Sequence, residues 1–261
     1  MFPTIEYIGG RALNAYKLFQ EIFALVIKIS TSLFYKKSFN SASRNVLLHQ
    51  VYFSSIQILP LLISTAAVVG FLLISVFFHV LTKFGLTEYL GRIIMGFIIT
   101  ELSPLITVLL IALRSSSAMN TEIAVMKVNK EIYTLKMFNI DEISYLFLPR
   151  VISGIIAVVL LSGIFSIIVL TSGFIYFLLF YGMSLDAYAN LLLNSAEISD
   201  IILTIIKCSA FGSFIAVIPI RYGLNASDDL TSIPIAVLNG MVAVFIAIII
   251  IEVLILLARL F

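Results

Sequence analysis

Three ionisable side chains lie inside long apolar stretches of the chain, where a charge is costly. Glu101, Lys207 and Glu252 each fall within a segment long enough to cross a membrane. A charged side chain at such a depth normally faces an opposite charge or a water-filled cavity. A lysine ammonium pairs equally well with a carboxylate or with a phosphate. These residues therefore predict one of two things: a polar ring that meets a lipid head group, or an ion pair that locks helices together.

The three charges are predicted to share one depth, beside a break in a helix. Counted from the predicted ends of their spans at about 1.5 Å per residue, each lies roughly 9–14 Å from the same membrane face. Pro104 cannot donate a hydrogen bond to the carbonyl of Thr100, so the helix should bend or open beside Glu101. We take Pro104 as the fourth member of this candidate site, and Lys207 as the direct partner of a phosphate.

The composition places these residues in a polytopic membrane protein. Of the 261 residues, 61% are hydrophobic and 11% are charged, and the mean hydropathy is +1.16. Soluble domains are nearer a quarter charged. The net charge of +2 is too small to suggest a nucleic-acid partner. Because a span needs about 20 apolar residues, the sequence predicts five spanning helices: Val51–Phe78, Ile93–Leu113, Val151–Tyr181, Ile201–Ile220 and Ile233–Leu257.

The N-terminal part of the chain is predicted to form a separate segment, residues 1–48, ahead of a transmembrane domain at residues 49–261. Within residues 13–35 apolar side chains recur at helical spacing, while Lys17, Glu21 and Lys28 fall on the other side. This pattern is typical of an amphipathic helix that lies in the membrane interface. The alternative is a poor spanning helix, because residues 22–27 are strongly apolar.

Lysine and arginine in the loops predict the orientation of the chain, because cytoplasmic loops carry an excess of them. The N-terminal segment and the loop at residues 114–150 are the richest in these residues, whereas residues 182–200 contain none. The N-terminus and the 114–150 loop are therefore predicted to be cytoplasmic, and Phe261 to lie outside. Lys83, Arg92 and Arg259 run against this bias but are outnumbered.

The loop between the second and third spans is predicted to contain one amphipathic helix, Ser117–Phe138. Its apolar stripe consists of Ala118, Val125, Val128, Ile132 and Leu135, and its polar face of Lys127, Lys130, Glu131 and Thr134. Asn139 is a plausible stop. Such a helix can present a docking surface to a soluble partner, or it can be a solvated surface helix that binds nothing.

Motifs in and around this loop resemble a known family. Glu101-Leu-Ser-Pro104, Arg114, Glu122-Ile-Ala-Val-Met126-Lys127-Val128, Leu135, Asp141 and Pro149-Arg150 follow one another over about fifty residues in the order and spacing found in MlaE permeases. These are the membrane subunits of Mce-type lipid ABC transporters. The resemblance implies a cytoplasmic coupling helix that contacts the ATPase through Glu122, Met126, Lys127, Lys130, Glu131 and Leu135. Arg114, Asp141 and Arg150 flank it, and we expect the two arginines to anchor helix ends at head-group level.

The same resemblance implies a function and partners. The chain would be the permease subunit of a transporter that moves phospholipid, or a similar lipid, between the cytoplasmic membrane and the outer envelope. Its expected partners are a second copy of itself, a separate ABC ATPase and an Mce-domain protein on the outer side. No cofactor is expected, because ATP would be bound by the partner subunit. The expected location is the inner membrane of a bacterium or a membrane of an organelle of bacterial origin.

No motif in the sequence indicates catalysis. There is no phosphate-binding P-loop, no G-x-S-x-G and no H-E-x-x-H. The sequence therefore predicts neither ATP hydrolysis nor another enzymatic activity, and no metal site. Two alternatives remain: an ABC permease for another apolar substrate, and a membrane scaffold that assembles partners without transport. An intramembrane enzyme has only scattered carboxylates in its favour.

Overall fold

Five long apolar helical runs make up most of the chain that the structure describes. The computed structural model describes residues 20, 24, 26–28, 47, 48, 50–52 and 55–260, which are helical with short connections and contain no strand. Among the described residues, five helical runs are long and apolar enough to cross a membrane: Gln50–Lys83, Thr87–Val128, Ile143–Tyr181, Ile198–Leu224 and Ser232–Arg259. Each run contains one of the five spans predicted from the sequence. The prediction of an all-α membrane protein with five transmembrane helices is confirmed.

The first two runs are built from several consecutive elements. The first includes η2 (Ile56–Ile58) and α3 (Leu59–Lys83); the second consists of η3 (Thr87–Tyr89), α4 (Leu90–Ile93), η4 (Ile94–Leu102), α5 (Ser103–Ile111), η5 (Ala112–Ser116) and α6 (Ser117–Val128). Both η4 and η5 are π-helical. Because α6 continues the second span without a break, the predicted loop helix begins as an extension of that span.

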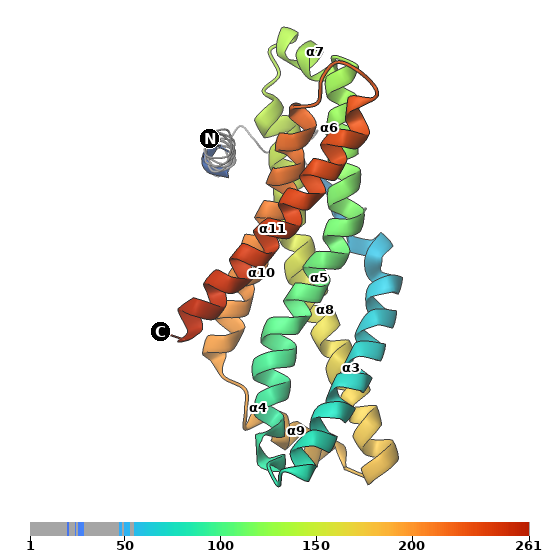
Figure 1. Cartoon of the computed structure of the whole chain (residues 1–261), viewed down its shortest axis with the longest axis vertical. Helices are drawn as coiled ribbons and strands as arrows, with labels where there is room; N and C mark the ends of the chain where they lie inside the picture. The colour runs from blue at the N-terminus through green and yellow to red at the C-terminus, as the bar shows by residue number, and fades with distance from the viewer. Residues whose placement is uncertain are drawn as a thin grey trace, which may run out of the picture.

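The remaining elements complete the bundle. They are α7 (Glu131–Met137), the π-helical η6 (Ile143–Phe147), α8 (Leu148–Tyr181), α9 (Leu185–Leu193), α10 (Ile198–Leu224) and α11 (Ser232–Leu260). In Figure 1, α7 and α9 lie at opposite ends of the long axis of the molecule. The structure therefore has two distinct ends, joined by the long helices.

Helices α8 and α10 form the centre of the bundle. The first packs against α3, α5 and α10, and the second packs against α6, α8 and α11. Gly154 on α8 and Gly212 on α10 allow close approach, because a Cβ at Gly154 would lie 2.8 Å from the carbonyl oxygen of Gly212. Small residues at helix crossings permit this kind of backbone contact in membrane proteins. The crossing fixes α10, and with it Lys207, relative to the rest of the bundle.

Most of the N-terminal segment lies outside the described residues. Within it, Gln20, Ala24 and 26–28 are helical. The choice between an interfacial and a spanning helix at residues 13–35, and the division of the chain at residue 48, both stay predictions.

Candidate functional site

Lys207 is the centre of a cluster of charged side chains where three spans meet. Its Nζ donates a hydrogen bond to Oε2 of Glu101 on η4, and another to Oε1 of Glu252 on α11, the latter over 2.8 Å. Lys207 itself, on α10, is only 1% exposed. The structure thus brings together the three intramembrane charges that the sequence placed at one depth.

Asp200 and Arg259 complete this group, which we call the charge cluster: Glu101, Asp200, Lys207, Glu252 and Arg259. The Arg259 guanidinium lies 2.9 Å from Oε1 of Glu101 and 2.7 Å from Oδ1 of Asp200. Neither residue was predicted as part of the site, although the sequence contains a signal for both. Asp200 precedes Lys207 by seven residues on α10, and Glu252 precedes Arg259 by seven on α11. Seven residues are about two helical turns, so each pair shares one helix face.

The charge cluster contains three carboxylates and two basic side chains. Glu101 accepts from both bases, through a different oxygen each time. Oε2 of Glu252 is buried and has no hydrogen-bond partner within the part of the chain that the structure describes. Removing one partner of a buried ion pair leaves an uncompensated charge, which costs far more than loss of a surface pair. The cluster therefore holds η4, α10 and α11 together through strongly interdependent contacts.

The backbone opens beside Glu101, as the sequence predicted from Pro104. Glu101 lies in the π-helical η4, and the amide of Ser103 donates to the carbonyl of Ile98, five residues earlier. Nη1 of Arg259 donates to the carbonyl of Gly96 at 3.1 Å. Short π-helical segments within α-helices frequently mark functional sites. Here the widened turn gives the Arg259 guanidinium a backbone acceptor next to Glu101.

A cavity of about 230 Å³ lies against the charge cluster, between η4, α10 and α11. Its apolar wall is formed by Leu203, Ile206, Ile255 and Ala258, and four members of the cluster also line it: Glu101, Asp200, Lys207 and Arg259. Of the two bases, Arg259 is the more accessible, with 32% of its side chain exposed. Charged groups of both signs therefore lie beside a hydrocarbon wall, an arrangement that matches an amphiphile with a charged head group.

The predicted loop helix is in fact two helices. Helix α6 ends at Val128, and α7 begins at Glu131 after Lys130 adopts a left-handed conformation with φ of 60°. The prediction of one helix over Ser117–Phe138 was wrong, because such a residue ends the regular helical path. The predicted stop is correct: α7 ends at Met137, and Asn139 follows with φ of 58°.

The apolar stripe was also placed on the wrong face of α6. Ala118 is exposed, and Val125 and Val128 are only partly buried. The buried side chains are Met119, Asn120, Ile123 and Ala124. The reason is that α6 packs against α10 and α11, so the neighbouring helices, rather than the membrane surface, select its inner face.

The residues that the resemblance assigned to ATPase contact lie along both helices of this α6–α7 segment. Glu122, Lys130 and Glu131 are exposed, whereas Met126, Lys127 and Leu135 are partly buried. Nδ2 of Asn129 donates to Oε1 of Glu131 at 3.3 Å, which joins the turn to the first residue of α7. The exposed members belong to a surface that a partner can reach, while Met126 packs against the core.

Arg150 is buried inside the protein, so its side chain does not contact lipid head groups. It is 1% exposed, and its Nη2 lies 2.7 Å from Oε1 of Glu122. The expectation that Arg150 anchors a helix end at the surface was wrong, because the start of α8 is covered by neighbouring elements. The pair instead ties α6 to α8. Nε and Nη1 of Arg150 have no hydrogen-bond partner within the described residues.

Arg114 and Asp141 hold the two ends of the loop. Nη1 of Arg114 donates to the carbonyl of Gln57 at 2.5 Å, which links the second span to the first. Asp141 accepts from the amides of Ile143 and Ser144, both at 3.3 Å, and so caps the third run. Partial burial alone would raise the pKa of the Asp141 carboxyl, but hydrogen bonds from Ser144 and Ile143 and the charge of Lys28 together lower that pKa below its usual value.

Comparison with known proteins identifies the family. The family model described as Permease MlaE matches residues 47–258. A chloroplastic protein of Arabidopsis thaliana named trigalactosyldiacylglycerol 1 is 30% identical over 194 residues, which make up 70% of this chain and 53% of the plant protein. A probable ABC transporter permease of Synechocystis is 27% identical over 63% of this chain and 64% of its own length.

A third relative carries a more specific name. The intermembrane phospholipid transport system permease protein MlaE of Haemophilus influenzae is 29% identical over 112 residues, or 43% of each chain. The chain spans about half of the length of the plant relative and about two thirds of that of the cyanobacterial one. The family model, in contrast, covers nearly all of the five-span region. This chain therefore belongs to the MlaE family of ABC transporter permeases.

Proposed function

We propose that this chain is the membrane subunit of a transporter that moves a phospholipid between the cytoplasmic membrane and the outer envelope. A separate ATPase docks on the α6–α7 segment and supplies the energy. The charge cluster receives the lipid head group, with the α6–α7 segment on the cytoplasmic side. In this arrangement ATP is bound by the partner, and this chain contributes the path and the mechanical link.

The observation that carries this proposal is a single helical run that joins the two regions. Thr87–Val128 is continuous and contains both Glu101 of the charge cluster and Glu122, which pairs with Arg150. At about 1.5 Å per residue the two carboxylates are roughly 30 Å apart along the helix. The π-helical η4 and η5 interrupt its α-helical geometry. A displacement of α6 by a partner is therefore transmitted along one element to Glu101.

The surface of the α6–α7 segment supports the partner assignment. Tyr133, Met137 and Phe138 are 60%, 70% and 73% exposed, at the end of the molecule occupied by α7 (Figure 1). Exposed apolar side chains that are grouped together commonly mark protein interfaces. Lys130 and Glu131 lie beside them and are also exposed, so a partner would meet aromatic, apolar and charged groups in a small area.

The charge cluster and its cavity support a lipid as the substrate. Lys207 and Arg259 line the cavity together with Glu101, Asp200 and four apolar side chains, which matches the charged head group of a phospholipid attached to hydrocarbon. The name of the Haemophilus relative refers to phospholipid transport, and the resemblance of the sequence adds the expected partners. These are a second copy of the chain, an ABC ATPase and an Mce-domain protein on the outer side, in the inner membrane of a bacterium or in an organelle of bacterial origin.

The proposal is tested by exchanging two charges on the docking surface. In Lys130→Glu/Glu131→Lys the composition is unchanged but the charge pattern that faces the ATPase is reversed. We expect lipid transfer by the reconstituted complex to fall at least tenfold, with stability of the isolated chain unchanged because both side chains are exposed. A matched control exchanges charge at the other end of the molecule, in Lys83→Glu/Glu88→Lys, and should leave transfer intact.

The same experiment separates the alternatives. Loss of transfer while the partner chains still copurify excludes a scaffold that only assembles them. Unchanged transfer in the exchanged variant would refute docking at this surface. Copurification of an Mce-domain protein with the wild-type complex distinguishes lipid transfer across the envelope from export of another apolar substrate, which needs no such partner.

A further inference from the structure

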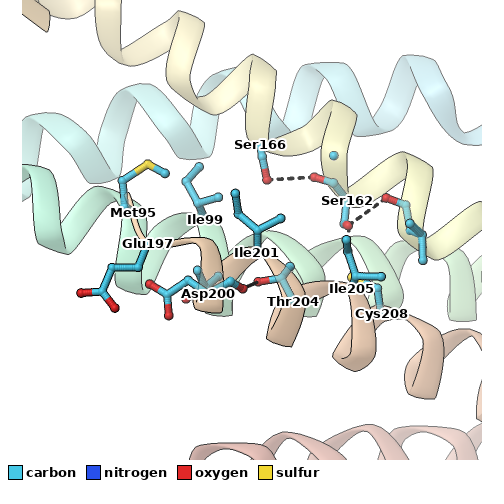
Figure 2. Close-up of a pocket in the computed structure, with 13 residues that line it drawn as sticks. Met95, Ile99, Ser162, Ser166, Glu197, Asp200, Ile201, Thr204, Ile205 and Cys208 are labelled. Carbon is cyan, nitrogen blue, oxygen red and sulfur yellow. Dashed lines mark hydrogen bonds between the residues drawn. The ribbon is translucent and has the colours of Figure 1, made fainter. Parts of the chain in front are cut away.

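A second cavity lies next to the charge cluster, along an adjacent face of the first turns of α10, and Thr100, Asp200 and Thr204 line both cavities. It is a groove of about 180 Å³ between η4, α8 and α10, and Figure 2 shows the side chains that line it. Met95, Ile99, Ile201 and Ile205 form much of its wall. Glu197 and Asp200 lie at one end, and Ser162 and Cys208 lie at the other (Figure 2). We propose that this groove holds one acyl chain of a membrane phospholipid.

The hydroxyl groups of the groove leave no donor for a polar ligand. A hydroxyl has one hydrogen to donate, and all four are directed to carbonyls of their own helices. Thr204 donates to Asp200 at 2.7 Å, Ser166 to Ser162 at 2.9 Å, and Ser162 to Val159 at 3.2 Å. The fourth, Thr100, donates to Gly96 at 2.6 Å. Beyond its acidic end the groove is therefore suited to hydrocarbon.

Gly163 leaves space in the groove that the fold does not require. A Cβ at Gly163 would meet no atom within 4 Å, although this residue lies in the middle of α8. The other two glycines of α8 differ, because a Cβ at Gly154 or Gly173 would collide with a neighbouring element. Glycine destabilises a helix interior relative to alanine. Neither packing nor backbone conformation explains Gly163, whereas an occupant of the groove does.

The dimensions and the position of the groove fit a single acyl chain of a lipid. Between Asp200 and Cys208 the helix advances about 12 Å, and the volume is below that of pockets for drug-sized molecules. Gly163, Ile201 and Ile205 are exposed within spans that cross the membrane, so the open side faces hydrocarbon rather than water. Asp200 pairs with Arg259, which places the acidic end of the groove beside the charge cluster. A lipid whose head group meets the cluster can therefore extend one tail along α8.

The test is photolabelling of the full chain in lipid nanodiscs. The probe is phosphatidylethanolamine with a diazirine near the end of one acyl chain, and adducts are mapped by mass spectrometry. We expect adducts on α8 around Ser162–Ser166 and on α10 around Ile201–Cys208. Gly163→Leu should lower them at least fivefold, and Gly163→Ala less than twofold, because only the larger side chain fills the groove. Thr171→Leu, an exposed site on α8 outside the groove, is the matched control and should leave labelling unchanged.

A second variant fills the groove from the wall formed by α10. It keeps the test valid if Gly163→Leu fails to fold. Ile201→Trp on α10 should also lower labelling at least fivefold. Equal labelling in the wild type and in the filled variants, or adducts as frequent around Thr171 as in the groove, would overturn the proposal. This inference rests on the proposed function only in identifying the bound lipid with the transported one. Because labelling needs no ATPase, a chain that binds the probe but transfers no lipid would refute the proposed function alone.

Discussion

Glu101 of the charge cluster and helix α6 lie on the same helical run, but the charge cluster buries its charged side chains whereas the α6–α7 segment exposes several of its own. In the cluster, Lys207 is buried between Glu101 and Glu252. In the α6–α7 segment, Lys130 and Glu131 are exposed, and apolar side chains beside them face outward. Buried ion pairs fix helices relative to one another, whereas exposed side chains are free to meet a partner. The difference indicates that the charge cluster holds helices together, whereas the α6–α7 segment is available for contact with a partner.

The strongest test of this contrast is removal of the central base. Lys207→Ala leaves Glu101 and Glu252 buried without their shared partner, and loss of one partner from a buried pair costs about 3–5 kcal/mol. We expect a loss of that size in the free energy of unfolding, measured by denaturation in detergent, together with loss of lipid transfer. Lys83→Ala, at an exposed lysine, is the control. Full transfer by a stable Lys207→Ala protein would remove Lys207 from the mechanism.

A smaller loss is expected at the accessible edge of the cluster. Arg259→Gln removes the contacts to Glu101 and Asp200, but the arginine side chain is 32% exposed, so water compensates part of the loss. The expected destabilisation is about 1 kcal/mol, and lipid transfer should fall more than stability does if Arg259 meets the head group. A destabilisation as large as that of Lys207→Ala would show that accessibility does not distinguish the two bases.

Asp141 caps the start of the third helical run, Ile143–Tyr181, and Asp141→Ala tests this cap. Loss of a helix cap costs about 1 kcal/mol. The pKa of the Asp141 carboxyl is lowered in the folded state from an ordinary value of 3.8, so its stabilisation is fully present above pH 3.8 and is lost as the pH falls through the lowered pKa. The stability difference between wild type and variant should therefore shrink on acidification. A difference that grows as the pH falls would contradict this sign.

The smallest expected effect on stability lies in the turn between α6 and α7. Lys130→Gly relieves the left-handed conformation of a residue with a Cβ, which should stabilise the chain by about 0.5–1 kcal/mol. Because the exposed ammonium is also lost, binding of the ATPase, measured by titration, should weaken. An increase in stability with unchanged binding would show that Lys130 serves the turn and not the partner.

The sequence predicted the spans and the meeting of three charges, but not the full cluster. Each span is a long apolar run, and Glu101, Lys207 and Glu252 stood out because they interrupt such runs. Arg259 and Asp200 were overlooked because each lies near the end of its helix, where charge is ordinary. The sequence signal for them is a spacing of seven residues, from Asp200 to Lys207 and from Glu252 to Arg259. This spacing indicates a shared site only when α10 and α11 are known to be neighbours.

The errors around the loop have a different physical origin. Nothing in the sequence requires Lys130 to be left-handed, because glycine and asparagine are the residues that favour this conformation. The inner face of α6 is set by α10 and α11, which are distant in sequence, so periodicity alone gave the wrong stripe. Burial of Arg150 likewise follows from the neighbouring elements that cover the start of α8, and a single sequence reveals neither this cover nor the pairing with Glu122.

The most direct test of the account is the side of the membrane on which the α6–α7 segment lies. In Tyr133→Cys, with the buried Cys208 as an internal reference, an impermeant thiol reagent should label position 133 in inside-out vesicles and not in intact cells. Bound ATPase should protect it. Labelling of intact cells would place this segment opposite the cytoplasm, and neither docking of the ATPase nor the proposed path along Thr87–Val128 could then stand.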